Sequence, residues 1–332
     1  MNADGHAEEG LSESSYKQRL FIQGGNFHKP ESLVVEDNGG LVPIDQSQLD
    51  SEFRERYELV RPIGRGGMGH IYLAQDKLLE RPAAVKFLTQ GLVSAAATRF
   101  MEEARAQAQL NHPNIVTLIT FSGRARIPYI IFEYVEGKSL AEIIKEKGRL
   151  PIELAIKWMD QLAKGMEYAH SKGVLHRDLK PANLLIDRES SSIRIIDFGL
   201  AKRDKRTREI TNPGDVIGSP SSMAPEQAKG QKSVLQTDVY AAGIILFQML
   251  TGFAPFDRAT VSETLMAHIN APVPDPRDHR PSIPPPLAVL TKMCLEKSPF
   301  ERPANFFAVR QLLAMCGKGY YEPPADTKPR RN

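Results

Sequence analysis

Residues 176–183 read His-Arg-Asp-Leu-Lys-Pro-Ala-Asn, and residues 197–199 read Asp-Phe-Gly. The first run contains a carboxylate that can accept a proton, Asp178, an ammonium that can balance negative charge, Lys180, and a side-chain amide, Asn183. The second run adds another carboxylate, and carboxylate and amide oxygens are ligands that hard divalent cations prefer. Each residue alone is plausible in a surface turn, but the complete set indicates a catalytic site made of positioned charge.

The composition is that of a globular protein, with 332 residues of which 41% are hydrophobic and 25% charged. The longest apolar stretch, at residues 239–250, is too short to span a bilayer, and the N-terminus lacks the pattern of a signal peptide. The two cysteines, Cys294 and Cys316, lie far apart and lack the spacing of a metal site. We therefore expect no membrane span and a reducing, cytoplasmic location.

Charge is distributed unevenly along the chain. Residues 1–55 carry 11 acidic and 4 basic side chains, so the net charge of +3 combines −7 in this segment with +10 in the remainder. A basic body suits a nucleotide ligand but is as common in proteins that bind no polyanion, and we expect no nucleic-acid partner. Residues 1–55 also lack sustained hydrophobic periodicity, which predicts a flexible acidic extension.

From residue 57 the sequence pattern predicts an α+β fold with a small β-rich lobe followed by a larger helical lobe. We place the domain at residues 56–316, with the small lobe at 56–135, the large lobe at 136–316 and a frayed tail at 317–332. The expected strands cover residues 57–60, 71–74, 83–88, 115–121 and 129–132. The expected helices cover residues 94–110, 140–146, 152–172, 237–250, 261–269, 287–295 and 304–315.

Glycines at positions 64, 66 and 69 lie between two strand-like runs. A dinucleotide-binding fingerprint would need a helix directly after these glycines, so a strand-turn-strand flap whose backbone N–H groups cover phosphates is the better interpretation. Lys86 ends the run Ala84-Val85-Lys86, and a lysine among apolar strand residues needs a charged partner. Glu103, on the helix that follows, is the partner we expect.

Taken together these motifs resemble those of the eukaryotic-type protein kinases, in the same order, along residues 64–303. Gly-Gly-Met-Gly at residues 66–69, Asn-His-Pro-Asn-Ile-Val at 111–116 and Ala-Pro-Glu-Gln-Ala at 224–228 look most like the bacterial Ser/Thr kinases of this type. The resemblance implies the two-lobed protein kinase fold, with an antiparallel β lobe that carries one main helix and a mostly helical second lobe.

The resemblance implies an ATP-dependent Ser/Thr protein kinase. It assigns to Asp178 the task of accepting or orienting the proton of the substrate hydroxyl, and to Lys180 a place near the transferred phosphoryl group. It makes Asn183 and Asp197 the ligands of Mg²⁺, for which Mn²⁺ is a substitute. Lys180-Pro181, two residues before Asn183, resembles the serine/threonine branch, so protein substrates with Ser or Thr acceptors are expected.

The resemblance also implies that Lys86, paired with Glu103, holds the α- and β-phosphates of ATP and that both belong to the catalytic set. The implied nucleotide pocket is formed by the glycine flap, the neighbouring strands and the segment between the lobes. Its residues are Ile63, Gly64, Gly66, Gly69, Ile71, Ala84, Lys86, Phe132, Glu133, Val135 and Leu185.

Two further positions match structural residues of the family. Asp238 matches the buried helix aspartate that braces the catalytic loop, and Arg302 matches the buried partner of Glu226. Removing one member of such a pair strongly destabilises a protein.

Regulation through the segment that follows Asp-Phe-Gly is also implied. In the family, the residue at the position of Arg177 meets a phosphate on this activation segment, and Thr211 followed by Thr207 are the expected phosphorylation sites. Ser219 takes the position of the hydroxyl residue that contacts the catalytic aspartate and lysine. A homodimer for trans-autophosphorylation is a further expectation.

Three positions depart from the pattern of the family. Gln107 stands where kinases usually have an apolar residue of the stacked core between the lobes, so we expect it to weaken the active arrangement. Ser222 stands where an aromatic residue commonly precedes Met-Ala-Pro-Glu, which puts the packing of the substrate-docking loop in question. Ala182 replaces a glutamate of kinases that recognise basic substrates, so we expect no strong need for an arginine three residues before the acceptor.

Two other functions remain open from the sequence. A pseudokinase scaffold would keep the fold without turnover, although such proteins usually lose at least one catalytic residue. A small-molecule phosphotransferase of kinase-like fold would share the catalytic loop but would not be expected to keep Met223-Ala224-Pro225-Glu226 and Arg302.

Overall fold

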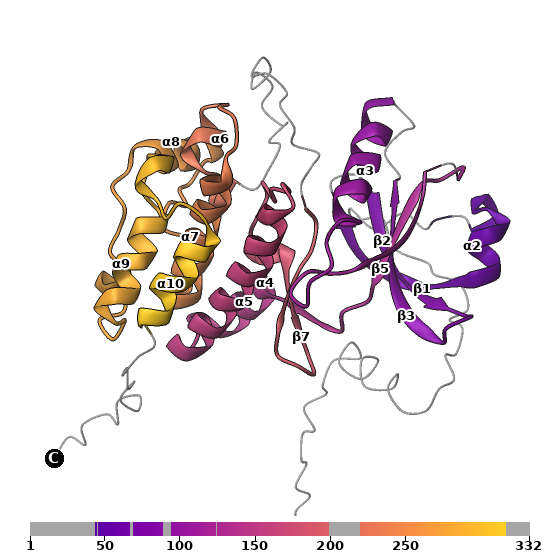
Figure 1. Cartoon of the computed structure of the whole chain (residues 1–332), viewed down its shortest axis with the longest axis horizontal. Coiled ribbons are helices and arrows are strands. Elements are labelled where there is room, and N and C mark those ends of the chain that lie inside the picture. The colour runs from indigo at the N-terminus through magenta and orange to yellow at the C-terminus, as the bar shows by residue number, and fades with distance from the viewer. Residues whose placement is uncertain are drawn as a thin grey trace, which may run out of the picture. The chain divides into compact units, whose positions relative to one another are not determined.

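The computed structural model describes residues 44, 46–66, 69–88, 94–123, 125–198 and 220–316. All the elements described here belong to the unit Asp45–Asn332. After two short helical segments, this unit forms an antiparallel sheet with one main helix and continues as a mostly helical lobe, which confirms the predicted α+β fold class (Figure 1).

The first lobe is built on a five-stranded antiparallel sheet in the order β1-β2-β3-β5-β4. Phe100 and Ala104 of the main helix pack against Leu88 and Ile130 of the sheet, so that the helix lies beside β3 and β5. The strands are β1 (Tyr57–Gly66), β2 (Gly69–Asp76), β3 (Arg81–Leu88), β4 (Leu118–Ser122) and β5 (Tyr129–Glu133), and the helix is α3 (Ser94–Gln107).

A short helix, α2 (Ser51–Arg56), precedes the sheet and packs on it. The side chain of Asp50 accepts a hydrogen bond from the backbone N–H of Phe53 at 2.7 Å, which caps the helix start. Phe53 is buried, with its ring centroid 5.0 Å from that of Tyr129 and 5.6 Å from that of Phe87. Residues 51–55, which the sequence predicted to lie in a flexible extension, belong to a helix that contributes to the core.

The second lobe begins with a three-stranded sheet that the sequence analysis did not predict. Its strands are β6 (Gly137–Ser139), β7 (Leu184–Asp187) and β8 (Ile193–Ile195), in the order β6-β7-β8. A Cβ atom at Gly137 would lie 1.9 Å from the carbonyl oxygen of Ile186, so only glycine permits this approach of β6 to β7. The catalytic-loop residues 176–183 lie directly before β7, and Asp197 follows β8, so this sheet positions both motifs.

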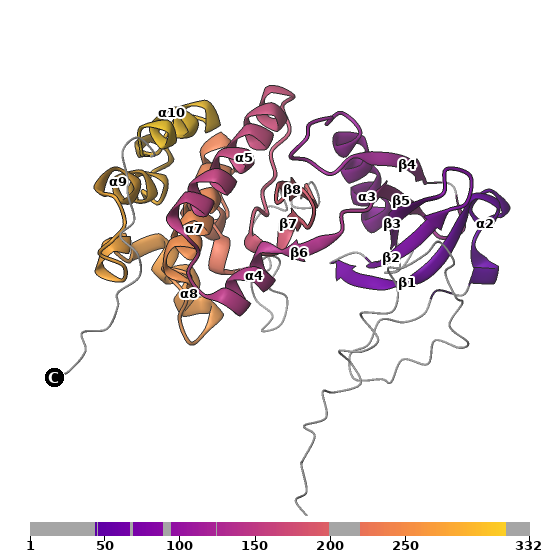
Figure 2. The ribbon, with the colours of Figure 1, turned by 90° about the horizontal axis from the view of Figure 1, so that it is seen from below.

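The rest of the lobe is helical. In α7 every residue from Thr237 to Phe247 is buried, which makes this helix the centre of the lobe's core. Helices α5, α7, α9 and α10 pack on one another (Figure 2). The helices are α4 (Leu140–Lys147), α5 (Ile152–Ser171), α6 (Pro225–Ala228), α7 (Leu235–Thr251), α8 (Val261–Asn270), α9 (Pro285–Cys294) and α10 (Phe306–Cys316).

Short 3-10 helices cover Gln46–Gln48, Pro181–Asn183, Pro220–Ser222, Pro276–Asp278 and Pro299–Glu301. The helix expected from residue 287 begins at Pro285, because proline is tolerated in the first turn, where no intrahelical N–H is needed. Within the described ranges, none of the helices combines the length and the apolar character needed to cross a bilayer.

Candidate active site

Lys86 lies at the centre of the site, on β3. Its Nζ lies 2.5 Å from Oε1 of Glu103 on α3 and 2.8 Å from Oδ1 of Asp197, which follows β8. Burial lowers the pKa of Lys86, but the charges of Asp197 and Glu103 outweigh burial and hold this pKa above its ordinary value, so the side chain is an ammonium. The expected contact between Lys86 and Glu103 is present, and Lys86 also forms an ion pair with Asp197.

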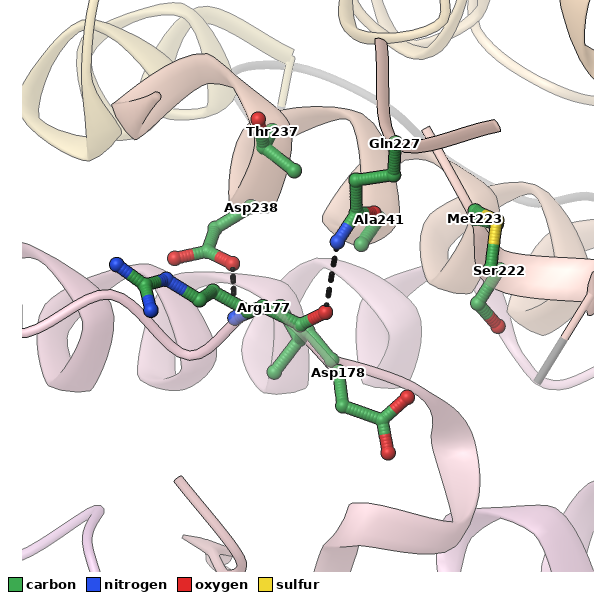
Figure 3. A pocket seen from close by; sticks show the side chains of 9 residues that line it. Arg177, Asp178, Ser222, Met223, Gln227, Thr237, Asp238 and Ala241 are labelled. Carbon is green, nitrogen blue, oxygen red and sulfur yellow. Dashed lines mark hydrogen bonds between the residues drawn. The ribbon is translucent and has the colours of Figure 1, made fainter. Parts of the chain in front are cut away.

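The backbone of the catalytic loop is held by Asp238, at the start of α7. The carboxylate accepts a hydrogen bond from the backbone N–H of Arg177 at 2.8 Å (Figure 3). It accepts another from the backbone N–H of His176 at 2.9 Å. Nε2 of His170, on α5, lies 2.8 Å from the same carboxylate. Burial raises the pKa of Asp238, but the hydrogen bonds that its carboxylate accepts from His170 and from the backbone of His176, with the electrostatic influence of the two rings, outweigh burial and lower it, so Asp238 is ionised.

Two residues of the site adopt left-handed backbone conformations, Arg177 with φ of 63° and Asp197 with φ of 55°. Residues other than glycine rarely do so, and each such conformation costs on the order of 1–3 kcal/mol. The contacts of Asp238 with the loop and of Lys86 with Asp197 hold these conformations in place. The two strained residues lie in the runs 176–183 and 197–199.

His176 is fully buried between the two motifs. Its Nε2 lies 3.0 Å from the carbonyl oxygen of Ile196 and must therefore donate, while Nδ1 accepts from the backbone N–H of Asp178 at 3.3 Å. One neutral tautomer satisfies both contacts, and burial lowers the pKa of His176 below its ordinary value. The ring centroid also lies 4.8 Å from that of Phe198, so His176 joins the catalytic loop to the Asp-Phe-Gly motif.

Asp178, Lys180 and Asn183 form the polar end of the loop. Nζ of Lys180 lies 3.0 Å from Oδ2 of Asp178, and Nδ2 of Asn183 donates to the carbonyl oxygen of Asp178 at 2.8 Å. Because the amide nitrogen of Asn183 is used internally, its oxygen is the atom that suits a cation. Residues 178–183 therefore present a carboxylate, an ammonium and an amide oxygen close together in the sequence.

The donors available for a divalent cation are the amide oxygen of Asn183 and the carboxylate of Asp197, both oxygens and both suited to magnesium. Within the described residues, no group of three or more His, Cys, Asp or Glu side chains could hold a metal ion. A cation here would take its remaining ligands from nucleotide phosphates and water, which is how magnesium is usually bound.

The register of the five-stranded sheet places several of the predicted nucleotide-pocket residues opposite one another. Ile71 pairs with both Gly64 and Lys86, Gly66 pairs with Gly69, and Ala84 pairs with Phe132. Ile63 precedes Gly64 on β1, and Leu185 lies on β7 opposite Ser139, while Val135 is buried in the segment between β5 and β6.

The side chain of Glu133 makes contacts that the sequence did not predict. Its carboxylate accepts a hydrogen bond from the backbone N–H of Thr117 at 2.6 Å and forms an ion pair with Arg194 on β8. Arg194 also donates to the carbonyl oxygen of Pro113 at 3.0 Å. The side chain of Glu133 thus ties the segment between the lobes to β8.

The substrate-docking end contains the expected buried pair of Glu226 and Arg302. The two guanidinium nitrogens of Arg302 each lie 2.9 Å from a different carboxylate oxygen of Glu226, and Thr237 donates to the same carboxylate at 2.7 Å. Both side chains of the pair are buried. Gln227, which the sequence analysis did not single out, donates from Nε2 to the carbonyl oxygen of Arg177 at 2.9 Å (Figure 3).

Ser222 is buried and lies beside a small cavity of about 10 Å³, the space of one water molecule (Figure 3). The serine that stands in place of the usual aromatic residue therefore lies beside a space no larger than one water molecule. The cavity is lined by Arg177, Asp178, Leu179, Ser222, Met223, Gln227, Thr237, Asp238 and Ala241. Thr207, Thr211 and Ser219 lie outside the described residues.

Comparison with known proteins identifies the family. Residues 57–315 match the family model described as protein kinase domain. The chain is 40% identical over 250 residues to a probable serine/threonine-protein kinase of Clostridium perfringens, covering 74% of this chain and 36% of that protein. It is 37% identical over 249 residues to the serine/threonine-protein kinase PrkC of Bacillus subtilis, covering 74% and 38%.

A third relative, the serine/threonine-protein kinase PknB of Mycobacterium leprae, is 33% identical over 282 residues, covering 82% of this chain and 44% of that protein. The chain therefore belongs to the protein kinase family. It spans between 36% and 44% of the length of these three relatives.

Proposed function

We propose that this chain is a serine/threonine protein kinase that transfers the γ-phosphoryl group of Mg–ATP to Ser or Thr hydroxyls of proteins. The observation that carries the proposal is the position of Lys86, 2.5 Å from Glu103 and 2.8 Å from Asp197. A cation held by a strand, a helix and a loop together is what the positioning of nucleotide phosphates requires. The names of the relatives, all serine/threonine kinases, support the acceptor class.

The chemistry rests on Asp178 and Lys180. Asp178 accepts or orients the proton of the attacking hydroxyl, and Lys180, 3.0 Å from that carboxylate, balances charge as the phosphoryl group moves. Asp238 fixes the backbone from which Asp178 projects, through its bonds to His176 and Arg177. Because phosphoryl transfer needs little covalent help, the geometry of these charges supplies most of the catalysis.

Asn183 and Asp197 would hold Mg²⁺ against the phosphates, with Mn²⁺ as a substitute. When bound, the metal ion neutralises charge on the β- and γ-phosphates. Lys86 already neutralises part of the charge of Asp197, with which it is in contact. Two protein ligands plus phosphates and water suit magnesium, which keeps several waters.

Two alternatives are less well supported. A pseudokinase would not need Lys86 held in contact with both Glu103 and Asp197, since that arrangement serves turnover. A small-molecule phosphotransferase would not need the buried pair of Glu226 and Arg302. Both alternatives remain outcomes of the experiment below.

Regulation is proposed to act through Arg177. Its Nε is buried and has no hydrogen-bond partner within the part of the chain that the structure describes. A phosphate on Thr211, or on Thr207, would supply that partner and order the activation segment. Phosphopeptide mapping after incubation with ATP tests this assignment, and full activity with neither threonine modified would refute it.

The setting of the protein is a further part of the proposal. Both cysteines, Cys294 and Cys316, are buried and form no disulfide, which suits a reducing cytoplasm. We place the kinase domain at residues 46–316, ten residues earlier than the sequence predicted, because α2 packs on the sheet through Phe53. Trans-autophosphorylation in a homodimer is the expected route of activation.

The test is an acceptor comparison. The purified chain is incubated with labelled ATP and Mg²⁺, with a generic protein substrate, or with small hydroxyl compounds, and the phosphorylated amino acids are identified. The proposal expects phosphoserine and phosphothreonine in protein and no label in small molecules. Label only in small molecules would support the phosphotransferase, and no label in any arm would support the pseudokinase.

A further inference from the structure

Gln107 is the last residue of α3 and is only 2% exposed, although the family usually has an apolar residue at its position. Its Nε2 donates a hydrogen bond of 2.7 Å to the backbone carbonyl oxygen of Val116. A buried amide of this kind is costly unless it is paired, and here the backbone supplies the partner. Gln107 therefore makes a specific contact in place of an apolar one.

The segment that receives this bond is itself attached to β8. The backbone N–H of Val116 donates to the carbonyl oxygen of Ile195 at 3.0 Å, and the N–H of Ile195 donates to the carbonyl oxygen of Asn114 at 2.8 Å. The side chain of Asn114 adds a bond of 3.0 Å to the carbonyl oxygen of Ile193. Val116 is thus fixed relative to the strand that leads to Asp197.

These contacts close a ring around the site. Lys86 contacts Glu103 on α3 and Asp197 after β8, while Gln107, one helical turn from Glu103, reaches β8 through Val116. Residues four apart lie on the same face of a helix, so a rotation of α3 that withdraws Glu103 also breaks the bond of Gln107. A hydrogen bond is directional and resists such a rotation more strongly than an apolar contact does.

We propose that Gln107 is a positioning residue for the phosphoryl-transfer site, because its bond to Val116 sets the rotation of α3 and thereby holds Glu103 against Lys86. The inference deepens the proposed kinase function and rests on it for its activity arm. It replaces the expectation that a polar residue at this position weakens the active arrangement.

The first measurement does not depend on activity. Lys86 is modified with an amine-reactive acylating reagent without nucleotide, and the labelling rate is followed by peptide mass spectrometry.

Two variants remove the hydrogen bond of Gln107. Gln107→Met keeps the length of the side chain and removes the donor, and Gln107→Glu turns an oxygen toward the carbonyl of Val116. Both variants should label Lys86 severalfold faster, since the loss of a buried hydrogen bond shifts an equilibrium by about twofold to tenfold. Gln109→Ala, an exposed glutamine two residues on, should label at the wild-type rate.

The second measurement is a double-mutant cycle on the rate of phosphoryl transfer. In the wild-type background, Gln107→Met should lower kcat by about fivefold to tenfold, whereas in the Glu103→Gln background it should have almost no effect, because Glu103 no longer transmits the position of α3. Thermal unfolding verifies that each variant is folded.

Unchanged Lys86 labelling in folded Gln107 variants, or the same loss of kcat in both backgrounds, would overturn the proposal. Faster labelling without transfer activity in any protein would instead contradict the proposed function and leave the positioning role supported. If Gln107→Glu fails to fold, the uncharged Gln107→Met variant carries the test.

Discussion

The carboxylate of Asp238 accepts the backbone N–H of Arg177 at 2.8 Å and so holds that residue in a left-handed conformation with φ of 63°. This bond connects α7, the buried centre of the second lobe, to the residue directly before Asp178. The position of Asp178, the carboxylate that we propose to be catalytic, is therefore set by the core of the lobe through one ionised side chain.

Asp238→Asn tests this relationship. An amide keeps the shape but turns a donor toward one of the two backbone N–H groups, so a strained loop loses a charged acceptor. We expect the free energy of unfolding to fall by about 3 kcal/mol and kcat to fall by at least tenfold. Urea denaturation and initial rates measure both, and Asp257→Asn, at an exposed carboxylate before α8, should change neither appreciably. Wild-type kcat in Asp238→Asn would refute the bracing role.

Arg302→Met tests the buried pair. The substitution leaves the carboxylate of Glu226 buried without its two guanidinium contacts, and we expect a loss of about 3–5 kcal/mol in the free energy of unfolding. The matched control is Lys164→Met, which removes a half-exposed ion pair with Asp160 and should cost less than about 1 kcal/mol. Equal losses in the two variants would show that the Glu226 pair contributes no more than a surface pair.

Phe53→Ala tests whether α2 belongs to the folded domain. The ring is 1% exposed and lies between Tyr57, Phe87 and Tyr129, so its removal leaves a cavity. We expect a loss of about 3–4 kcal/mol in urea denaturation. Phe300→Ala, at a side chain that is 96% exposed, should have almost no effect. A stability unchanged by Phe53→Ala would restore the predicted boundary at residue 56.

His268 predicts a pH dependence of stability. Burial, with smaller contributions from Lys297 and Arg258, lowers the pKa of His268 from 6.5 to about 4 in the folded protein. Between pH 4 and pH 6.5 the unfolded chain binds a proton at His268 that the folded chain does not bind. The free energy of unfolding therefore decreases as the pH falls below 6.5. We expect wild type to lose about 2 kcal/mol more than His268→Asn between pH 7.5 and pH 5, measured by urea denaturation. An equal loss of stability in wild type and in His268→Asn would contradict the lowered pKa of His268.

The sequence predicted the fold class and the contact of Lys86 with Glu103, because motif order and helix spacing constrain both. It did not predict α2, which depends on Phe53 meeting aromatic residues far along the chain, or the strands β6 to β8, which are too short to show a period. The partner of Gln107 is a backbone carbonyl, and since every residue has one, the sequence does not show which of them a side chain contacts. Gln227 was likewise within a recognised motif, but its bond to Arg177 required the folded loop.

The most direct test of the central claim compares wild type with Asp178→Asn in two assays, the affinity for Mg–ATP and the rate of phosphoryl transfer to a protein substrate. The account predicts unchanged nucleotide affinity, because Asp178 faces the substrate hydroxyl, and a transfer rate lower by about 10²-fold or more. Equal transfer by the two proteins would show that this loop does not carry the chemistry and would contradict the assignment as an active kinase.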